Sequence, residues 1–128
     1  MEASYHLGDL QLAIMRVLWA RGETTVADVH ETLEPERGLA LTTIATMLAK
    51  MEKKGVVDHR ADGRKFIYRP LISEEQVQRS MVADLTSQLF RGNIPALMNH
   101  LLAEHDIRPQ ELVQLRELID AHEREESR

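Results

Sequence analysis

The sequence contains no cysteine, which excludes disulfide bonds, thiolate metal sites and cysteine nucleophiles. Aromatic residues are scarce at 4%, so aliphatic residues and methionine must build the core, a mixture that favours helices over sheets. No apolar run approaches the roughly 20 residues that cross a bilayer, and residues 1–6 lack the basic start and apolar stretch of a signal peptide. These absences favour a cytoplasmic protein without membrane insertion.

Motifs that mark catalytic or cofactor sites are missing as well. The sequence has no HExxH pair, no glycine-rich phosphate loop and no GxSxG elbow. His100 and His105 lie near Glu104 and Asp106, but an offset of five residues does not bring two ligands together on one helix. We therefore expect no enzyme activity, no catalytic residues, no metal site and no cofactor.

Charge is distributed unevenly along the 128 residues, whose net charge is −5. Residues 42–70 hold seven basic and three acidic side chains. Residues 1–41 hold three basic and seven acidic side chains, and residues 71–128 hold six basic and eleven acidic ones. One short basic segment between two acidic flanks is typical of a localised anion-binding surface.

Helical periodicity and capping signals predict three helices in the first half of the chain. Asp9 is expected to cap the first helix, which ends at Gly22. Thr25 is expected to cap the second, which ends before a turn over residues 34–38. The third runs approximately from residue 40 to residue 54 and stops at Gly55.

The third helix has one apolar face and one polar face. Ile44, Met47, Leu48 and Met51 follow the i, i+3, i+4, i+7 spacing of a buried stripe. The other side and its flanks carry hydroxyl and ammonium groups: Thr42, Thr43, Thr46, Lys50 and Lys53. Because a major groove about 12 Å wide admits an α-helix, these are the candidate DNA contacts of a recognition helix. The alternative is an ordinary solvated helix face.

A β-hairpin is predicted after this helix. Residues 56–60 and 65–69 have the pattern of short strands, and an Asp-Gly pair in the connection between them is a strong hairpin signal. Arg60, Arg64 and Lys65 lie in this hairpin and are candidates for phosphate contacts. Three helices followed by a hairpin is the order of a winged helix-turn-helix. We therefore predict a mainly α protein with a winged-helix DNA-binding domain over residues 1–70.

The spacing of apolar residues in the segment 71–128 predicts three amphipathic helices. Ser73 with Gln76 predicts a capping box, Gly92 ends the first helix, and Pro109 opens the last. Three short helices make a thin core, so we expect a helical dimerisation domain over residues 71–128. The candidate dimer-interface residues are Met81, Leu85, Leu89, Leu97, Leu101, Leu112, Leu115 and Ile119. In the alternative arrangement, these helices pack back onto the N-terminal domain of a monomer.

The sequence resembles the penicillinase-repressor family of winged-helix transcriptional repressors. The matching stretches are LGDLQLAIMRVLWARG (7–22), TVADVHETL (25–33), LALTTIATMLAKMEKKGVVDHRADGRKFIYRP (39–70) and PQELVQLRELI (109–119). The resemblance implies a homodimer that binds palindromic double-stranded operator DNA and blocks promoter access. It also implies that Thr43, Thr46 and Lys50 occupy DNA-contact positions, and that Arg64 and Lys65 lie on the wing.

The chain departs from this resemblance in several places, one of which is Ala45, where some relatives carry an arginine, so the operator sequence is not expected to be shared. Copper-responsive relatives carry a C-terminal cysteine cluster, which is absent here. Antibiotic-responsive relatives are cut by a sensor protease at an Asn-Phe bond, and the matching bond is Asn99–His100, so a sensor protease is an expected partner. Because histidine replaces the aromatic residue, cleavage there stays open. Arg108 replaces the Ser or Asp cap expected before Pro109, which weakens that helix start by at most about 1 kcal/mol.

Two other classes of function stay open. The first is a winged-helix adaptor that binds proteins and never touches DNA, which the overall acidity favours and the basic hairpin disfavours. The second is a sensor that holds a small molecule between the winged helix and the C-terminal helices. The sequence offers no buried polar cluster that would mark such a pocket.

Overall fold

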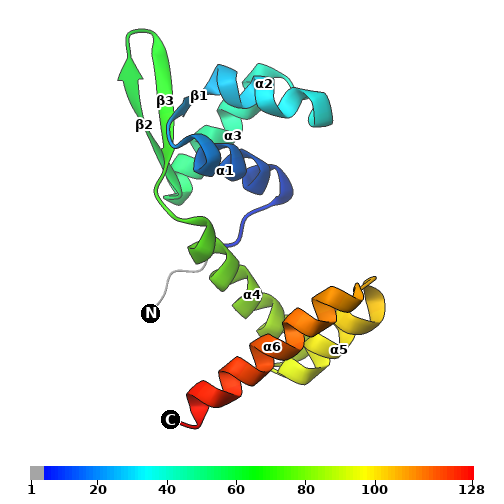
Figure 1. Ribbon diagram of the computed structural model, residues 1–128. Helices are drawn as coiled ribbons and strands as arrows, with labels where there is room; N and C mark the ends of the chain where they lie inside the picture. The colour runs from blue at the N-terminus through cyan, green and yellow to red at the C-terminus, as the bar shows by residue number, and fades with distance from the viewer. Residues whose placement is uncertain (1–4) are drawn as a thin grey trace. The chain divides into compact units, whose positions relative to one another are not determined.

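The computed structural model describes residues 5–128, and this part of the chain folds into six helices and a three-stranded sheet (Figure 1). The elements are α1 (Asp9–Arg21), β1 (Thr24–Thr25), α2 (Val26–Arg37), α3 (Leu41–Lys54), β2 (Val57–Asp62), β3 (Lys65–Pro70), α4 (Glu74–Phe90), α5 (Ile94–Glu104) and α6 (Pro109–Glu126). They form two compact units, Met1–Asp84 and Leu85–Arg128. Within the described residues, no helix combines the length and apolarity needed to cross a membrane.

The starts of α1 and α2 differ in how they are capped. Thr25 caps α2 as predicted, because its Oγ1 accepts the backbone N–H of Asp28 at 3.1 Å. The predicted cap of α1 is wrong, since Gly8 is the N-cap residue and Asp9 is already helical. The side chain of Gln11 accepts the Gly8 N–H at 3.2 Å and so satisfies one backbone donor of this helix start.

The end of α2 also differs from the prediction. Residues 34–37 were expected in a turn, but α2 continues through Pro35 to Arg37. Proline removes one backbone donor without ending this helix, because the left-handed conformation that terminates it falls on Gly38 (φ 59°). The N–H of Gly38 donates to the Glu34 carbonyl at 2.9 Å and completes the last turn.

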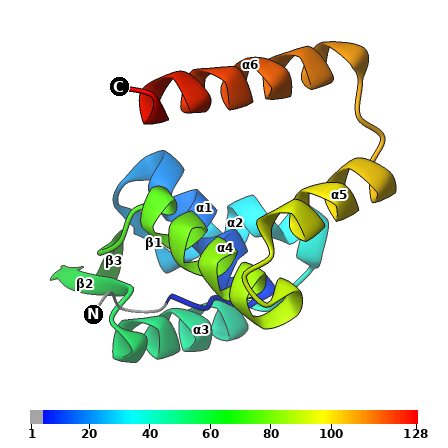
Figure 2. The same cartoon turned by 90° about the horizontal axis from the view of Figure 1, so that it is seen from below.

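The sheet has the strand order β1-β3-β2, and all of its pairs are antiparallel. Asp62 pairs with Lys65, so Gly63 and Arg64 form the hairpin turn, with Gly63 at φ 63°. The β2–β3 hairpin projects beyond helices α1–α3 in both views (Figures 1 and 2). Helices α1–α3 followed by this hairpin confirm the predicted winged helix.

The core of the first unit lies among α1, α2, α3 and the base of the hairpin. Its most deeply buried side chains are Ile14, Met15, Leu18, Val29, Ile44, Leu48, Met51, Val56, Val57 and Val77. Ile72 also belongs to this core, and its carbonyl accepts the indole N–H of Trp19 at 2.8 Å. The sequence predicts a domain boundary after Pro70, whereas the compact units divide after Asp84 because Ile72 and Val77 are buried in the first unit.

Helix α4 begins as predicted. The Ser73 N–H donates to Oε1 of Gln76 at 2.8 Å, and the Gln76 N–H donates to Oγ of Ser73 at 3.1 Å. This reciprocal pair is the predicted capping box, and it satisfies two backbone donors at once.

Local hydrogen bonds satisfy the helix starts of the second unit. Asn93 caps α5 by accepting the Ala96 N–H at 3.0 Å. At α6, Arg108 makes no side-chain cap, but Glu111 accepts its backbone N–H at 3.1 Å and its Nε at 3.0 Å. These hydrogen bonds lower the pKa of Glu111. Within residues 85–128, no hydrophobic side chain is fully buried.

We expect that Leu48→Ala will lower the free energy of unfolding of the first unit by about 2–5 kcal/mol, because Leu48 is wholly buried and truncation leaves a cavity. Chemical denaturation followed by circular dichroism measures this change. The matched control is Leu71→Ala, which truncates a leucine that is 48% exposed and should cost much less. Equal losses for the two variants would contradict this account of the core.

Candidate nucleic-acid interface

Helix α3 exposes the polar face that the sequence predicts. Ile44, Leu48 and Met51 are each at most 1% exposed, so this stripe is fixed in the core. The candidate recognition residues are all exposed on the remaining surface of the helix: Thr42, Thr43, Thr46, Lys50 and Lys53. The helix therefore presents hydroxyl and ammonium groups together, a combination that suits base edges and phosphates.

The lysines of α3 differ in whether their ammonium groups are engaged. Nζ of Lys54 donates to the His6 carbonyl at 2.5 Å and lies 3.3 Å from Oε1 of Gln11. Among the described residues, Lys50 and Lys53 make no ion pair or side-chain hydrogen bond. Two ammonium groups on this helix are therefore available for an external anion.

Two arginines on the strands of the hairpin are paired with carboxylates. Nη2 of Arg60 lies 3.1 Å from Oε2 of Glu23, and this hydrogen bond raises the pKa of Arg60. Arg69 donates to both carboxylate oxygens of Asp58, at 2.6 and 3.0 Å, and thereby lowers the pKa of Asp58. Arg60, a candidate phosphate ligand, therefore has an internal partner that a phosphate would have to replace.

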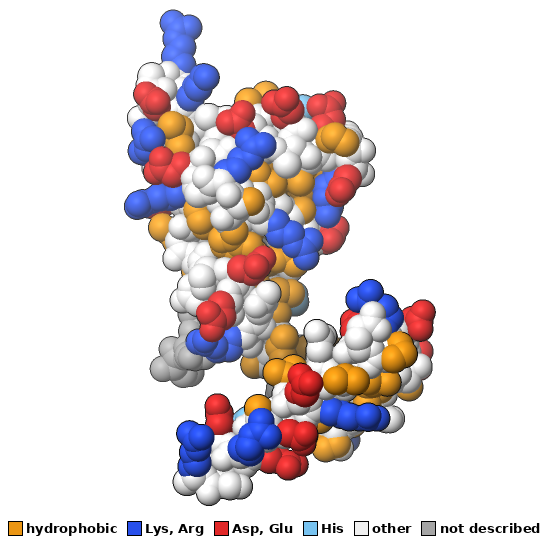
Figure 3. All heavy atoms as spheres, in the orientation of Figure 1, with side chains coloured by type: hydrophobic (Ala, Val, Ile, Leu, Met, Phe, Trp, Pro, Cys, Tyr) orange, Lys and Arg blue, Asp and Glu red, His pale blue; other side chains and the backbone are white. Residues whose placement is uncertain are grey.

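The hairpin turn carries the free cations of the wing. Arg64 and Lys65 are exposed, and neither forms an ion pair with any residue in the described part of the chain. Basic side chains stand at the tip of the hairpin in the space-filling view (Figure 3). Of the three predicted wing contacts, these two are available without breaking an internal bond.

The hairpin is joined to the last turns of α3 by a cluster that the sequence analysis missed. Nδ1 of His59 lies 2.5 Å from Oε1 of Glu52, and its ring centroid lies 4.6 Å from that of Phe66 and 5.2 Å from that of Tyr68. Burial raises the pKa of Tyr68. The members come from α3, β2 and β3, so no local sequence pattern marks them. The cluster fixes the base of the wing beside α3.

A second contact outside the sequence prediction holds the segment before α3. Nε2 of His30 donates to the Leu39 carbonyl at 2.8 Å, which connects α2 to the residues that lead into the recognition helix. Residues 5–128 contain no cluster of three or more histidine, aspartate or glutamate side chains placed to hold a metal ion.

The candidate dimer-interface residues are spread over both units. Met81 packs partly against the core of the first unit, so its side chain is already partly covered there. In the second unit, Leu97, Leu112 and Leu115 are half-buried. The other four are exposed: Leu85 by 41%, Leu89 by 71%, Leu101 by 38% and Ile119 by 57%.

An apolar groove of about 370 Å³ lies between α5 and α6 in the second unit. Leu101 and Leu102 line it from α5, and Leu115 and Leu118 line it from α6. Hydrophobic side chains gather on the visible face of these two helices (Figure 3). Asn99 and His100, the candidate cleavage position, are exposed on α5, and the His100 ring contacts Phe90.

The chain is similar to known repressors along nearly its whole length. It is 24% identical to the penicillinase repressor of Bacillus licheniformis, over 95% of both chains. It is 39% identical to the transcriptional regulator BlaI of Mycobacterium tuberculosis, over 64% of this chain and 60% of that protein.

A solved structure supports the fold assignment. The solution structure of the DNA-binding domain of the repressor BlaI superposes with a TM-score of 0.52 at 32% identity, and the match covers 59% of this chain and 93% of that domain. The family model described as "Penicillinase repressor" matches residues 7–121. The chain therefore belongs to the penicillinase repressor family, a family of transcriptional repressors.

Proposed function

We propose that this protein represses transcription as a homodimer that binds a palindromic operator and blocks access to the promoter. The observation that carries the proposal is the exposed polar face of α3 next to a wing whose tip has free cations. Similarity to the DNA-binding domain of a known repressor supports the same conclusion.

The interface divides its contacts between bases and phosphates. Helix α3 enters the major groove, where Thr42, Thr43 and Thr46 reach base edges or adjacent phosphates through short hydroxyl side chains. Four cations neutralise phosphates: Lys50, Lys53, Arg64 and Lys65. Arg60 joins them only when it releases Glu23. Phosphate contacts fix the position of the protein, whereas base contacts select the sequence.

The second unit supplies the dimer interface in this proposal. It has no fully buried hydrophobic side chain, and three of its large apolar side chains, Leu89, Leu118 and Ile119, are each more than half exposed. An apolar surface of this kind is stabilised by a second copy of the same chain, which presents the same face. Two-fold symmetry in the protein then matches two-fold symmetry in the operator.

Proteolysis of the dimerisation arm by a sensor protease is the proposed route of induction. Asn99 and His100 are exposed, which supports access to the bond between them. Both lie inside α5, so this helix must unwind locally before a protease can accept the chain in an extended form. Cleavage would separate α6 from the winged helix and remove part of the proposed interface.

We expect that Lys50→Ala will weaken binding to operator DNA and will reduce the slope of log K against log salt by about 0.9, because one phosphate contact is lost. The measurement is a fluorescence-anisotropy titration at several salt concentrations. The matched control is Lys54→Ala, on the same helix, because that ammonium group is engaged by His6 and Gln11. A slope that is unchanged in Lys50→Ala, or that falls equally in both variants, would count against Lys50 as a phosphate ligand.

We expect that Leu118→Glu will weaken dimerisation at least about tenfold, because a charge replaces an apolar side chain that lines the α5–α6 groove in each copy. Sedimentation velocity over a range of concentrations measures the dissociation constant.

The control for this variant is Gln110→Glu, which adds the same charge to α6 at a position that does not line the groove and lies roughly 80° around the helix from Leu118. It should leave the dimer intact. A wild-type chain that stays monomeric at every concentration would instead support an arrangement in which the helices pack within one monomer.

A further inference from the structure

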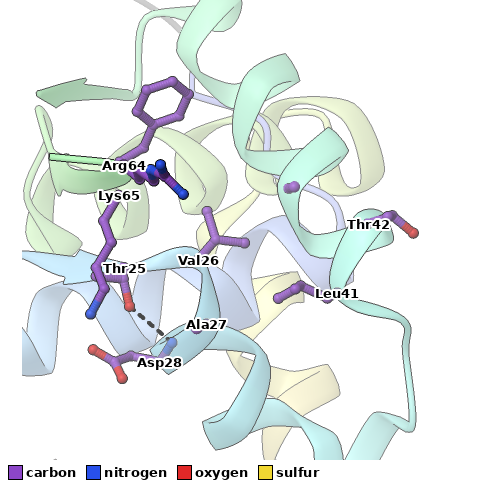
Figure 4. Close-up of a pocket in the computed structure, with 10 residues that line it drawn as sticks. Thr25, Val26, Ala27, Asp28, Leu41, Thr42, Arg64 and Lys65 are labelled. Carbon is purple, nitrogen blue, oxygen red and sulfur yellow. Dashed lines mark hydrogen bonds between the residues drawn. The ribbon is translucent and has the colours of Figure 1, made fainter. Parts of the chain in front are cut away.

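A groove of about 460 Å³ opens in the first unit where the starts of α2 and α3 meet the hairpin turn (Figure 4). Leu41 and Ala45 line it from α3, and Phe66 lines it from β3. In the close-up, the Leu41 side chain points into this space whereas Thr42 points away from it (Figure 4). Thr42 also contributes to the lining, so the groove is continuous with the candidate recognition surface, but its other α3 residues are apolar.

The groove is lined mainly by apolar groups, and two of its side chains are large and exposed. Leu41 is 47% exposed and Phe66 is 52% exposed. Neither is needed to close the core of the first unit, which the buried face of α3 fills with Ile44, Leu48 and Met51. Exposed apolar side chains that share one concave surface are typical of a binding site.

The charged residues at the groove indicate the kind of partner. Arg64 and Lys65 line it and form no ion pair with the described residues. Asp28 is the one acidic residue among the lining side chains. A partner that fits this groove presents an apolar group next to a negative charge. In double-stranded DNA, the apolar group exposed in the major groove is the 5-methyl group of thymine, and phosphates lie on either side.

We infer that the groove reads the 5-methyl group of an operator thymine, with Leu41 and Ala45 in contact with the methyl and Arg64 and Lys65 on the neighbouring backbone. This inference rests on the proposed function, because it requires that α3 enter the major groove. Leu41 opens α3, and the N-terminal residues of a recognition helix contact base edges. Leu41 is then a specificity-determining residue that selects thymine over cytosine without a hydrogen bond.

The test uses a duplex selected by the wild-type protein from a random-sequence pool. Each thymine of that duplex is replaced singly by uracil, which removes the methyl group and keeps every hydrogen-bonding group. Wild-type protein should lose about fourfold in affinity at one thymine in each half-site, from about 0.8 kcal/mol per buried methyl-sized group. Leu41→Ala should bind the thymine and uracil forms of that duplex equally well.

The control variant is Leu71→Ala, which truncates an equally exposed leucine that does not line the groove, and which should keep the fourfold preference. A thermal melt of Leu41→Ala confirms that the variant is folded, and an unchanged midpoint is expected because the side chain is exposed.

Two results would overturn the inference while leaving the proposed function in place. One is a selected duplex whose affinity is insensitive to uracil at every position, which would mean that the groove contacts only the backbone. The other is a Leu41→Ala variant that keeps the thymine preference. If the selection enriches no duplex over random DNA, the proposed function fails and this inference fails with it.

Discussion

Helix α3 is held in the core by Ile44, Leu48 and Met51, and the candidate interface depends on this burial. An α-helix repeats every 3.6 residues, so a stripe fixed on one side determines which residues face outward on the other. Thr42, Thr46 and Lys53 are exposed for this reason. The His59 cluster and the His30 contact then set the wing and the start of α3 relative to this fixed helix. The recognition surface is thus positioned by packing beneath it.

Internal ion pairs explain how an acidic chain can present a surface for a polyanion. Glu23 and Asp58 neutralise Arg60 and Arg69, which lie on the strands of the hairpin. Among the described basic residues of α3 and the hairpin, those that form no ion pair or side-chain hydrogen bond are Lys50, Lys53, Arg64 and Lys65. Screening limits electrostatic attraction to about 8 Å at physiological salt, so the local arrangement of these groups matters more than the net charge of −5.

The sequence was sufficient to predict the winged helix and the exposed face of α3, because periodicity and an Asp-Gly turn are local signals. It was not sufficient for features that join distant residues. Arg60 and Glu23 are 37 positions apart, and no pattern in either segment indicates their pairing. Helix ends were also difficult, since Gly8 rather than Asp9 caps α1. The prediction that Arg108 provides no side-chain cap for α6 was correct. It did not include the hydrogen bonds that Arg108 donates to Glu111, which compensate for the missing cap.

The most direct test of the account is a gel-shift titration of the purified protein against the DNA upstream of its own gene. The titration is made at two salt concentrations with random DNA as competitor. The account predicts a discrete complex that survives competition and weakens steeply as salt rises, because specific base contacts and several phosphate contacts form together. Equal and weak retention of both DNAs would contradict it and would favour an adaptor that binds proteins.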